Sequence, residues 1–407
     1  MEENGNNNKV SFRSGLLFGL TIGLTVALIV GIFAVVKIKS ISNALGSVLD
    51  LKTASKISVI SKVIDDCFYD YDDRKLTVDD MRDGLYRGIV SSMDDKYAEY
   101  YSKEELEQEI IDNQGIYYGI GAYISLGEDD YPFLSGIMAD TPAEKAGLRA
   151  GDVLVKVDDE STYGMTLDDV VSRVKGDDGT VVHLTIYREG ENDYLEIDVT
   201  RGAVETLSVG YDMLENDIGY IQIVRFEQAT VNQFTEAYEY IKENDAEGLI
   251  IDLRSNPGGL VSSVVGIADQ ILPEGLVFYE LDAQGNRKEY RCEGDNAIDI
   301  PLVVLVDGYS ASASEILSGA IRDHGIGTLV GEKTYGKGIV QDVKQLSDGS
   351  AVKLTVSAYY LPGGDNIQGT GIEPDVTVEL DVDAYYDEGI DTQLDKAIEV
   401  MNEKVGQ

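Results

Sequence analysis

Two short, almost wholly apolar runs constrain the fold of this 407-residue chain most strongly, GLIIDLR at 248–254 and PLVVLVD at 301–307. Apolar runs of this length without polar alternation indicate strands that are buried on both faces. Each run is followed by a polar turn and then by a helical pattern, at 260–272 and 312–323. Strands that alternate with helices predict a mainly parallel α/β sheet, in which function gathers where strands end and helices begin.

The segment before this α/β region has a different periodicity. GIYYGIGAYISL at 115–126 predicts strand, glycine turn and strand, and TLDDVVSRVKG at 166–176 predicts a helix closed by Gly176. TVVHLTIYR at 180–188 alternates like a half-buried strand. Size and element order together indicate a compact peptide-binding module. Upstream, 40–113 carries helical signals, with Thr77 as a candidate N-cap, and is expected to form a helical arm.

The run GLLFGLTIGLTVALIVGIFAVV at 15–36 contains no charged residue. It exceeds the roughly 20 residues that a membrane-spanning helix needs, and it is longer than the apolar part of a cleaved signal peptide. We therefore expect a single membrane anchor. Basic residues lie on both sides of the run, so the positive-inside rule does not decide its orientation.

Composition excludes several classes of function. A formal net charge of −41 would repel nucleic acid and anionic lipid headgroups. The chain has only two histidines and two cysteines, in no metal-ligand spacing, so we expect no metal site and no cofactor. Cys67 and Cys292 are expected to be free, buried thiols, with one bridge between them left open.

The stretch DGYSASASE at 307–315 places three serines at a predicted strand-to-helix boundary. Backbone N–H groups there, and in the SNPGG turn at 255–259, could stabilise an oxyanion. Lys337, between two glycines, could act as a base in a dry pocket. Taken alone, a serine at a helix start is usually a cap and a lysine in a glycine turn is usually solvated. His324 lies 12 residues after Ser312, roughly 18 Å along a helix, which argues against a histidine triad.

Several ordered motifs between 88 and 375 together resemble one family. They are GIVSSMDDKYAEYYSKEE at 88–105, YGIGAYI at 118–124, AGLRAGDVLVKVD at 146–158, DLRSNPGG at 252–259, SASASEIL at 310–317, GEKTYGKGIVQ at 331–341 and IQGTGIEPD at 367–375. The chain resembles the carboxyl-terminal processing, or tail-specific, serine proteases, which use a Ser-Lys pair and contain a PDZ domain. Three positions depart from the family pattern: Lys96 replaces the usual proline, Tyr309 a common glycine and Asp307 a frequent asparagine.

The resemblance assigns roles to residues of this sequence. It implies Ser312 as nucleophile, Lys337 as general base and Gln341 as the residue that orients the lysine. Ser310 and Ser314 would be structural supports, as would Asp323, and His183 would be an ordinary strand residue. An oxyanion hole would come from backbone N–H groups at Gly258 or Gly259 and at Ala313. The PDZ peptide site would comprise Tyr118, Gly119, Ile120, Gly121, Ala122 and Val171.

The expected fold class is a multidomain α/β protein with a single transmembrane helix, a helical arm, a PDZ domain and a ClpP/crotonase-like protease core. The expected boundaries are a tail at 1–14, the anchor at 15–37, a helical region at 38–114, the PDZ domain at 115–202, the protease core at 203–380 and a helical segment at 381–407.

The resemblance implies the function of a membrane-anchored, extracytoplasmic serine endopeptidase, because members of this family work outside the cytoplasm. It would bind protein substrates by exposed C-terminal tails, without nucleic acid, and could form a homo-oligomer through the helical region. A catalytically silent PDZ scaffold and an acyl-CoA enzyme of the crotonase class stay open as alternatives.

Overall fold

A computed structural model describes residues 50–69, 77–127 and 129–406. The chain divides into two compact units, 1–84 and 85–407. In the first unit, helix α3 (Leu51–Cys67) begins where the Asp50 carboxylate accepts the Thr53 N–H at 2.7 Å. Helix α5 (Val78–Ser91) begins after Thr77, whose hydroxyl accepts the Asp80 N–H, so the predicted cap is confirmed.

The predicted membrane anchor at 15–36 lies outside the described residues. Within the ranges that the structure describes, no helix is both long enough and apolar enough to cross a bilayer. Both cysteines are free, and only Cys292 is buried, whereas Cys67 is exposed on α3.

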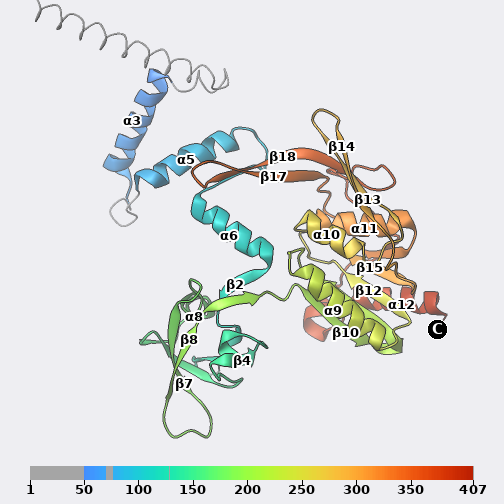
Figure 1. The fold of residues 1–407 in the computed structure, drawn as a ribbon, viewed down its shortest axis with the longest axis horizontal. Helices are drawn as coiled ribbons and strands as arrows, with labels where there is room; N and C mark the ends of the chain where they lie inside the picture. The colour runs from blue at the N-terminus through green and yellow to red at the C-terminus, as the bar shows by residue number, and fades with distance from the viewer. Residues whose placement is uncertain (1–49, 70–76, 128, 407) are drawn as a thin grey trace, which may run out of the picture. The chain divides into compact units, whose positions relative to one another are not determined.

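The core of the second unit is a six-stranded sheet that contains both apolar runs (Figure 1). All neighbouring pairs are parallel except the pair between the edge strand β10 and β11. The predicted, mainly parallel α/β sheet is therefore confirmed. In spatial order the strands are β10 (Val209–Leu214), β11 (Ile218–Ile223), β12 (Gly248–Asp252), β15 (Leu302–Val306), β16 (Gly327–Gly331) and β19 (Val376–Thr377).

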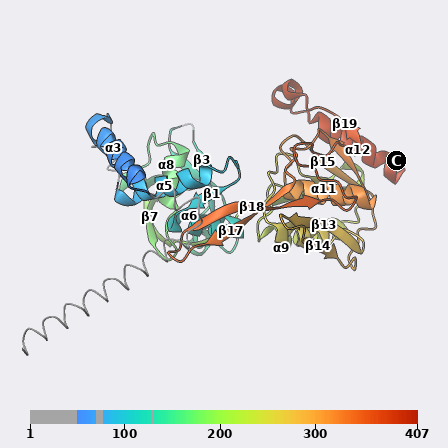
Figure 2. The ribbon, with the colours of Figure 1, turned by 90° about the horizontal axis from the view of Figure 1, so that it is seen from above.

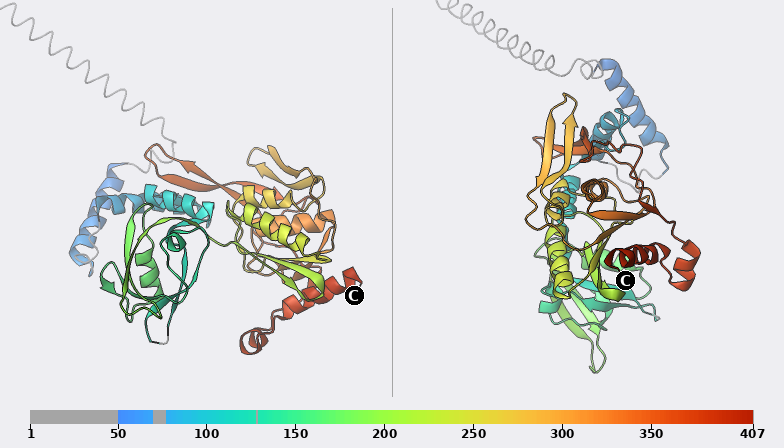
Figure 3. Two further views of the ribbon diagram at one scale, coloured as in Figure 1. Left: turned by 60° about the horizontal axis from the view of Figure 1, so that its bottom comes forward. Right: turned by 90° about the vertical axis from the view of Figure 1, so that its right-hand side faces the viewer.

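Helices cover both faces of this sheet. Because side chains alternate along a strand, Ile251 and Val304 face one layer while Ile250 and Val303 face the other. The first layer holds α9 (Thr230–Glu243), α10 (Val261–Ala268) and α11 (Ala313–His324), and the second holds α12 (Thr392–Val405), as Figure 3 shows. A 3-10 turn at Glu215–Asp217 and a π-helical turn at Ala384–Glu388 complete this part.

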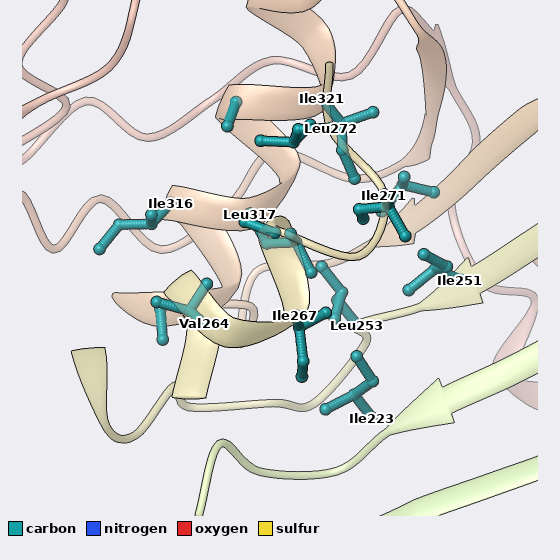
Figure 4. Packing of buried hydrophobic residues seen from close by; sticks show 14 of the residues in the cluster. Ile223, Ile251, Leu253, Val264, Ile267, Ile271, Leu272, Ile316, Leu317 and Ile321 are labelled. Atoms are coloured by element: carbon teal, nitrogen blue, oxygen red, sulfur yellow. The ribbon is translucent and has the colours of Figure 1, made fainter. Parts of the chain in front are cut away.

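Helices α10 and α11 pack on each other as well as on the sheet. Figure 4 shows Leu317 of α11 and Ile267 of α10 in one cluster with Ile223 and Ile251 of the strands. All four side chains are fully buried. The packing fixes the start of α11, where the candidate nucleophile lies, against the carboxyl ends of the central strands.

A second, five-stranded sheet was not predicted from the sequence. Its longest strand, β18 (Ala351–Tyr360), forms a hairpin with β17 (Ile339–Gln345), which is seen in Figures 1 and 2. The other strands are β1 (Glu99–Tyr101), β13 (Gly275–Asp282) and β14 (Arg287–Cys292). Because β1 pairs with β18, the region expected to be helical contains one strand that belongs to this sheet.

Helix α6 (Lys103–Gln114) leads into the peptide-binding module. The Ser102 hydroxyl caps its first turn, Glu105 completes a capping box, and Gly115 ends the helix in the left-handed conformation. A two-stranded pair of β2 (Ile116–Gly119) and β9 (Gly202–Glu205) then brings the two ends of the module together.

The module consists of a six-stranded antiparallel sheet and two short helices, which pack around an apolar cluster of their own. Helix α8 (Leu167–Val174) ends two residues before the predicted stop at Gly176. The elements are β3 (Ala122–Leu126), β4 (Pro132–Ile137), β5 (Val153–Val157), β6 (Glu160–Ser161), β7 (Val181–Tyr187), β8 (Leu195–Thr200), α7 (Pro142–Lys145) and α8 (Leu167–Val174).

Candidate active site

Ser312 lies at the junction between β15 and α11, as the sequence predicts. It is the N-cap of α11, with φ 55° and ψ −110°. A positive φ is strained for any residue with a side chain, at a cost of about 1–3 kcal/mol, and such strain persists only where the surroundings enforce it. The Tyr359 hydroxyl donates to the Ser312 carbonyl at 3.3 Å, and the Ser312 N–H donates to the Glu315 carboxylate at 2.9 Å.

The Glu315 carboxylate joins the serine turn to the lysine loop. Its Oε2 accepts the N–H groups of both Ser312 and Lys337, each at 2.9 Å. Its Oε1 accepts the Thr334 hydroxyl at 2.6 Å and the Gly336 N–H at 2.7 Å. The side chain is fully buried, so these four donors replace the water that an ionised carboxylate would otherwise require.

Sequence reasoning missed Glu315 and Thr334. The available signal was the position of Glu315, three residues after a serine N-cap, where a capping-box glutamate belongs. That pattern predicts the local bond to the Ser312 N–H. It does not predict the three bonds to the loop at 334–337, which depend on the tertiary fold.

Lys337 is half-buried beside the serine turn. Its Nζ lies 4.6 Å from the centroid of the Tyr97 ring. Burial lowers the pKa of Lys337 below that of an ordinary lysine, and the nearby positive charge of Lys353 lowers it further. A lowered pKa increases the fraction of neutral amine, which is the form that can accept a proton.

One cavity of about 290 Å³ brings the predicted catalytic groups together. Ser312, Lys337, Gln341, Gly258 and Gly259 all line it. The cationic side chains of Arg225 and Lys353 and the carboxylate of Glu109 also face this space, which we call the serine cavity.

The two glycines of the SNPGG turn differ in their free N–H groups. The Gly258 N–H donates to Asn256 Oδ1 at 2.8 Å, within the turn. The Phe226 N–H donates to the Gly258 carbonyl and the Leu260 N–H donates to the Phe226 carbonyl. Within the described residues, the N–H groups of Gly259 and Ala313 have no backbone acceptor. Of the two predicted glycines, Gly259 therefore has the N–H group that can stabilise an oxyanion.

Both positions require glycine. A Cβ on Gly258 would lie 2.7 Å from the Ala311 carbonyl oxygen and 2.9 Å from the Ala313 nitrogen. A Cβ on Gly259 would overlap the Phe226 carbonyl. With φ at +102° and +145°, the two residues also adopt backbone conformations that side chains disfavour.

The neighbouring serines hold the turn together. The Ser310 hydroxyl donates to the Leu253 carbonyl at 2.8 Å, and the Ser314 hydroxyl donates to the Asn256 carbonyl at 3.0 Å. Both side chains are fully buried. The Asp307 carboxylate accepts N–H groups from Ser255 and Tyr309, so it ties the glycine turn to the serine turn.

Gln341 lines the serine cavity from strand β17. Its side-chain amide donates to the Thr355 hydroxyl of β18 at 3.2 Å. The hairpin therefore fixes the position of Gln341, and its predicted role in orienting Lys337 stays a prediction.

The two histidines lie away from Ser312. At the other end of α11, a ring nitrogen of His324 is 2.8 Å from the Leu276 carbonyl of β13. Asp323 accepts the Gly363 N–H at 2.8 Å. His183 lies on the exposed face of β7 beside Asp198.

A groove in the peptide-binding module has a volume of about 240 Å³. It runs between the edge strand β3 and helix α8, and Ile120, Gly121, Ala122 and Val171 line it as predicted. Tyr118 does not line it and Tyr117 does, because successive strand residues point to opposite faces. Gly119 does not line the groove either; it ends β2 just before the lining residues Ile120, Gly121 and Ala122.

Within the ranges that the structure describes, no group of three or more histidine, cysteine, aspartate or glutamate side chains could hold a metal ion. The expectation that the protein needs no cofactor stays a prediction from the sequence.

Comparison with known proteins identifies relatives for both parts. Residues 217–378 match the model of peptidase family S41, and residues 133–188 match a PDZ domain model. A probable CtpA-like serine protease of Staphylococcus haemolyticus is 33% identical over 86% of this chain and 72% of its own length. The carboxy-terminal processing protease CtpA of Bacillus subtilis is 33% identical over 82% of this chain and 72% of its own.

Among solved structures, the photosystem II D1 C-terminal processing protease is 31% identical. The match covers 72% of this chain and 80% of that chain, with a TM-score of 0.45.

Proposed function

Because the chain belongs to peptidase family S41 and is a serine-type, carboxy-terminal processing protease with a PDZ domain, we propose that Ser312 and Lys337 perform its chemistry. The observation that carries this assignment is the Glu315 carboxylate, which holds the backbone N–H groups of both residues at the edge of one cavity. Neither the silent scaffold nor the acyl-CoA enzyme fits a peptidase of this family.

In the first half-reaction, the neutral Lys337 amine takes the proton of the Ser312 hydroxyl as Oγ attacks the scissile carbonyl carbon. The negative charge that develops on the carbonyl oxygen is stabilised by the N–H groups of Gly259 and Ala313. The protonated lysine then gives its proton to the departing amine, which leaves an ester on Ser312.

In the second half-reaction, water attacks this ester. Lys337 accepts a proton from the water and returns one to Ser312 Oγ as the ester bond breaks. The lysine must cycle between its two protonation states, so its lowered pKa suits the role. Gln341 is proposed to keep the lysine in place from β17.

We also propose that the PDZ groove binds the C-terminal tail of a protein substrate. The edge strand β3 can accept the tail as an additional strand, and the loop at Ile120, Gly121 and Ala122 can bind its carboxylate. Val171 and Ile120 give the groove an apolar wall, which favours an apolar final residue.

The remaining proposals concern location and organisation. Residues 15–37 are proposed to anchor the protein in the cell membrane, with the catalytic part outside the cytoplasm, and the helical region 38–114 to mediate self-association. The boundaries at 115–202 and 203–380 are proposed for the PDZ and protease domains. Support comes from the uncharged run at 15–36 and from the family resemblance.

The tail hypothesis can be tested with one unstructured polypeptide that carries three different ends. A free apolar C-terminus should be cleaved faster than an amidated or an Asp-ended one, because only the first provides both the carboxylate and the apolar residue. Val171→Asp should remove most of the difference, whereas Val181→Asp, at an exposed valine on β7, should retain it. Equal rates for all three tails in the unaltered protein would rule out tail recognition.

Ile120 is less suitable for this test than Val171. Its side chain is only 2% exposed and belongs to the core cluster of the module, so an aspartate there would place a carboxylate among apolar groups.

A further inference from the structure

A second cavity adjoins the serine cavity. It has a volume of about 560 Å³, and it shares Pro257 and Lys337 with the serine cavity. Its other lining residues include Tyr97, Tyr309 and Tyr335. We call it the tyrosine cavity. The mechanism above leaves this space without a role, although it opens directly beside the proposed base and the oxyanion turn.

The walls of the tyrosine cavity are held in place by Lys96. Its Nζ donates to the Tyr335 hydroxyl at 2.9 Å and lies 4.8 Å from the centroid of the Tyr97 ring. It is also 5.2 Å from the centroid of the Tyr335 ring. An ammonium group over two aromatic rings attracts both, so Lys96 joins the segment before β1 to the lysine loop.

Tyr309 contributes an exposed edge to the same cavity. The residue is 74% exposed although it lines the tyrosine cavity. Its backbone is nevertheless fixed, because its N–H donates to the Asp307 carboxylate at 2.9 Å. An exposed ring on a fixed turn can be covered by a bound side chain, and the burial of both would favour binding.

We propose that the tyrosine cavity is a specificity pocket, which binds a large apolar or aromatic side chain from a substrate residue directly next to the scissile bond. The inference rests on the proposed function, because it takes Ser312 as the site of bond cleavage. Pro257 precedes the oxyanion glycines and Lys337 is the proposed base, so a side chain in this cavity belongs to a residue at the reacting peptide bond.

Size and charge both restrict what the tyrosine cavity can bind. A phenylalanine or leucine side chain can pack against the tyrosine rings, which prefer tilted or offset contacts with another ring. Alanine would contact less of the ring surface and bury less apolar area. Lysine and arginine would place a second cation beside Lys96, and this repulsion disfavours them.

The proposal is tested with two series of otherwise identical peptides with free apolar C-termini. One series varies the residue before the scissile bond among Phe, Leu, Ala and Lys, and the other varies the residue after it. At one of the two positions, kcat/KM should be at least about 10-fold higher for Phe than for Ala, as expected for an apolar pocket that discriminates by several methylenes, and lowest for Lys.

Three variants separate the role of the ring from other effects. Tyr309→Ala should remove most of the preference for Phe, and Tyr309→Phe should retain it. Tyr386→Ala, at a tyrosine that is 80% exposed near the C-terminus, should not change the preference. The absence of a preference at both positions, or a preference that survives Tyr309→Ala unchanged, overturns the proposal.

A parallel measurement distinguishes failure of this inference from failure of the proposed function. Labelling of Ser312 by a fluorophosphonate and cleavage of a disordered protein such as casein report the catalytic pair regardless of side-chain preference. Labelling and cleavage without selectivity overturn only the specificity pocket. Loss of both labelling and cleavage in the unaltered protein overturns the proposed function and the pocket with it.

Discussion

At the scale of single residues, the proposed role of Lys337 as a base depends on how its amine stays neutral. Burial is the main cause of its lowered pKa, and the positive charge of Lys353, which lines the same cavity, is the next largest. Burial alone would lower the pKa of Lys353, but the bond from its ammonium group to the Tyr101 hydroxyl at 2.7 Å and the nearby Glu109 and Glu99 outweigh burial and raise this pKa. Lys353 thus stays charged over the pH range in which Lys337 loses its proton.

This arrangement predicts a pH profile. The value of kcat/KM should rise with pH as Lys337 deprotonates, with a midpoint below the pKa of an ordinary lysine. In Lys353→Gln the neighbouring positive charge is gone, so the pKa of Lys337 should rise and the midpoint should move to higher pH. Lys344→Gln, at an exposed lysine on β17, is the matched control and should keep the original midpoint. The same midpoint in Lys353→Gln and the unaltered protein would contradict this explanation.

At the scale of secondary-structure elements, the position of Ser312 depends on how α11 packs. Leu317 lies one turn into that helix, is fully buried, and belongs to the cluster with Ile267 of α10 (Figure 4). Its truncation leaves a cavity beneath the helix that begins at the proposed nucleophile.

Leu317→Ala should lower the free energy of unfolding by about 2–5 kcal/mol, as measured by denaturant titration. Val382→Ala, at an exposed position, should change it by less than about 0.5 kcal/mol. A Leu317→Ala protein as stable as the unaltered one would show that α11 is not held by this cluster.

The sequence predicted some elements better than others, for physical reasons. The strands at 248–252 and 302–306 were predicted because burial on both faces leaves a continuous apolar run. The strands β13, β14, β17 and β18 were missed, since they form a sheet with more exposed positions and no apolar run of that kind. Pairings such as β1 with β18 join residues far apart in the chain, and local sequence patterns do not indicate such pairings.

The candidate site shows the same division. Ser312 and Lys337 could be proposed from the sequence because their motifs match a family. The Glu315 bonds that connect them, and the Tyr97 ring against Lys337, depend on tertiary contacts. The motif alone does not indicate which of Gly258 and Gly259 has a free N–H group. The structure distinguishes them, because the Gly258 N–H donates to Asn256.

At the scale of the whole molecule, the uncharged run at 15–36 predicts attachment to a membrane. The full-length chain should sediment with membranes after high-salt and alkaline washing. A version that starts at Asp50 should stay in the supernatant, with unchanged cleavage of a short peptide, because its proposed catalytic groups are all retained. Release of the full-length chain by the washes would exclude an integral anchor.

Covalent labelling can show whether Ser312, activated by Lys337, is the nucleophile. After reaction with a fluorophosphonate, peptide mapping by mass spectrometry can distinguish Ser310, Ser312 and Ser314. We expect modification at Ser312 alone, at a rate greatly reduced in Lys337→Ala. The rate should be unchanged in His324→Ala, because the native His324 ring bonds to the Leu276 carbonyl. Modification at another serine, or labelling that needs His324 and proceeds normally without Lys337, would contradict this assignment.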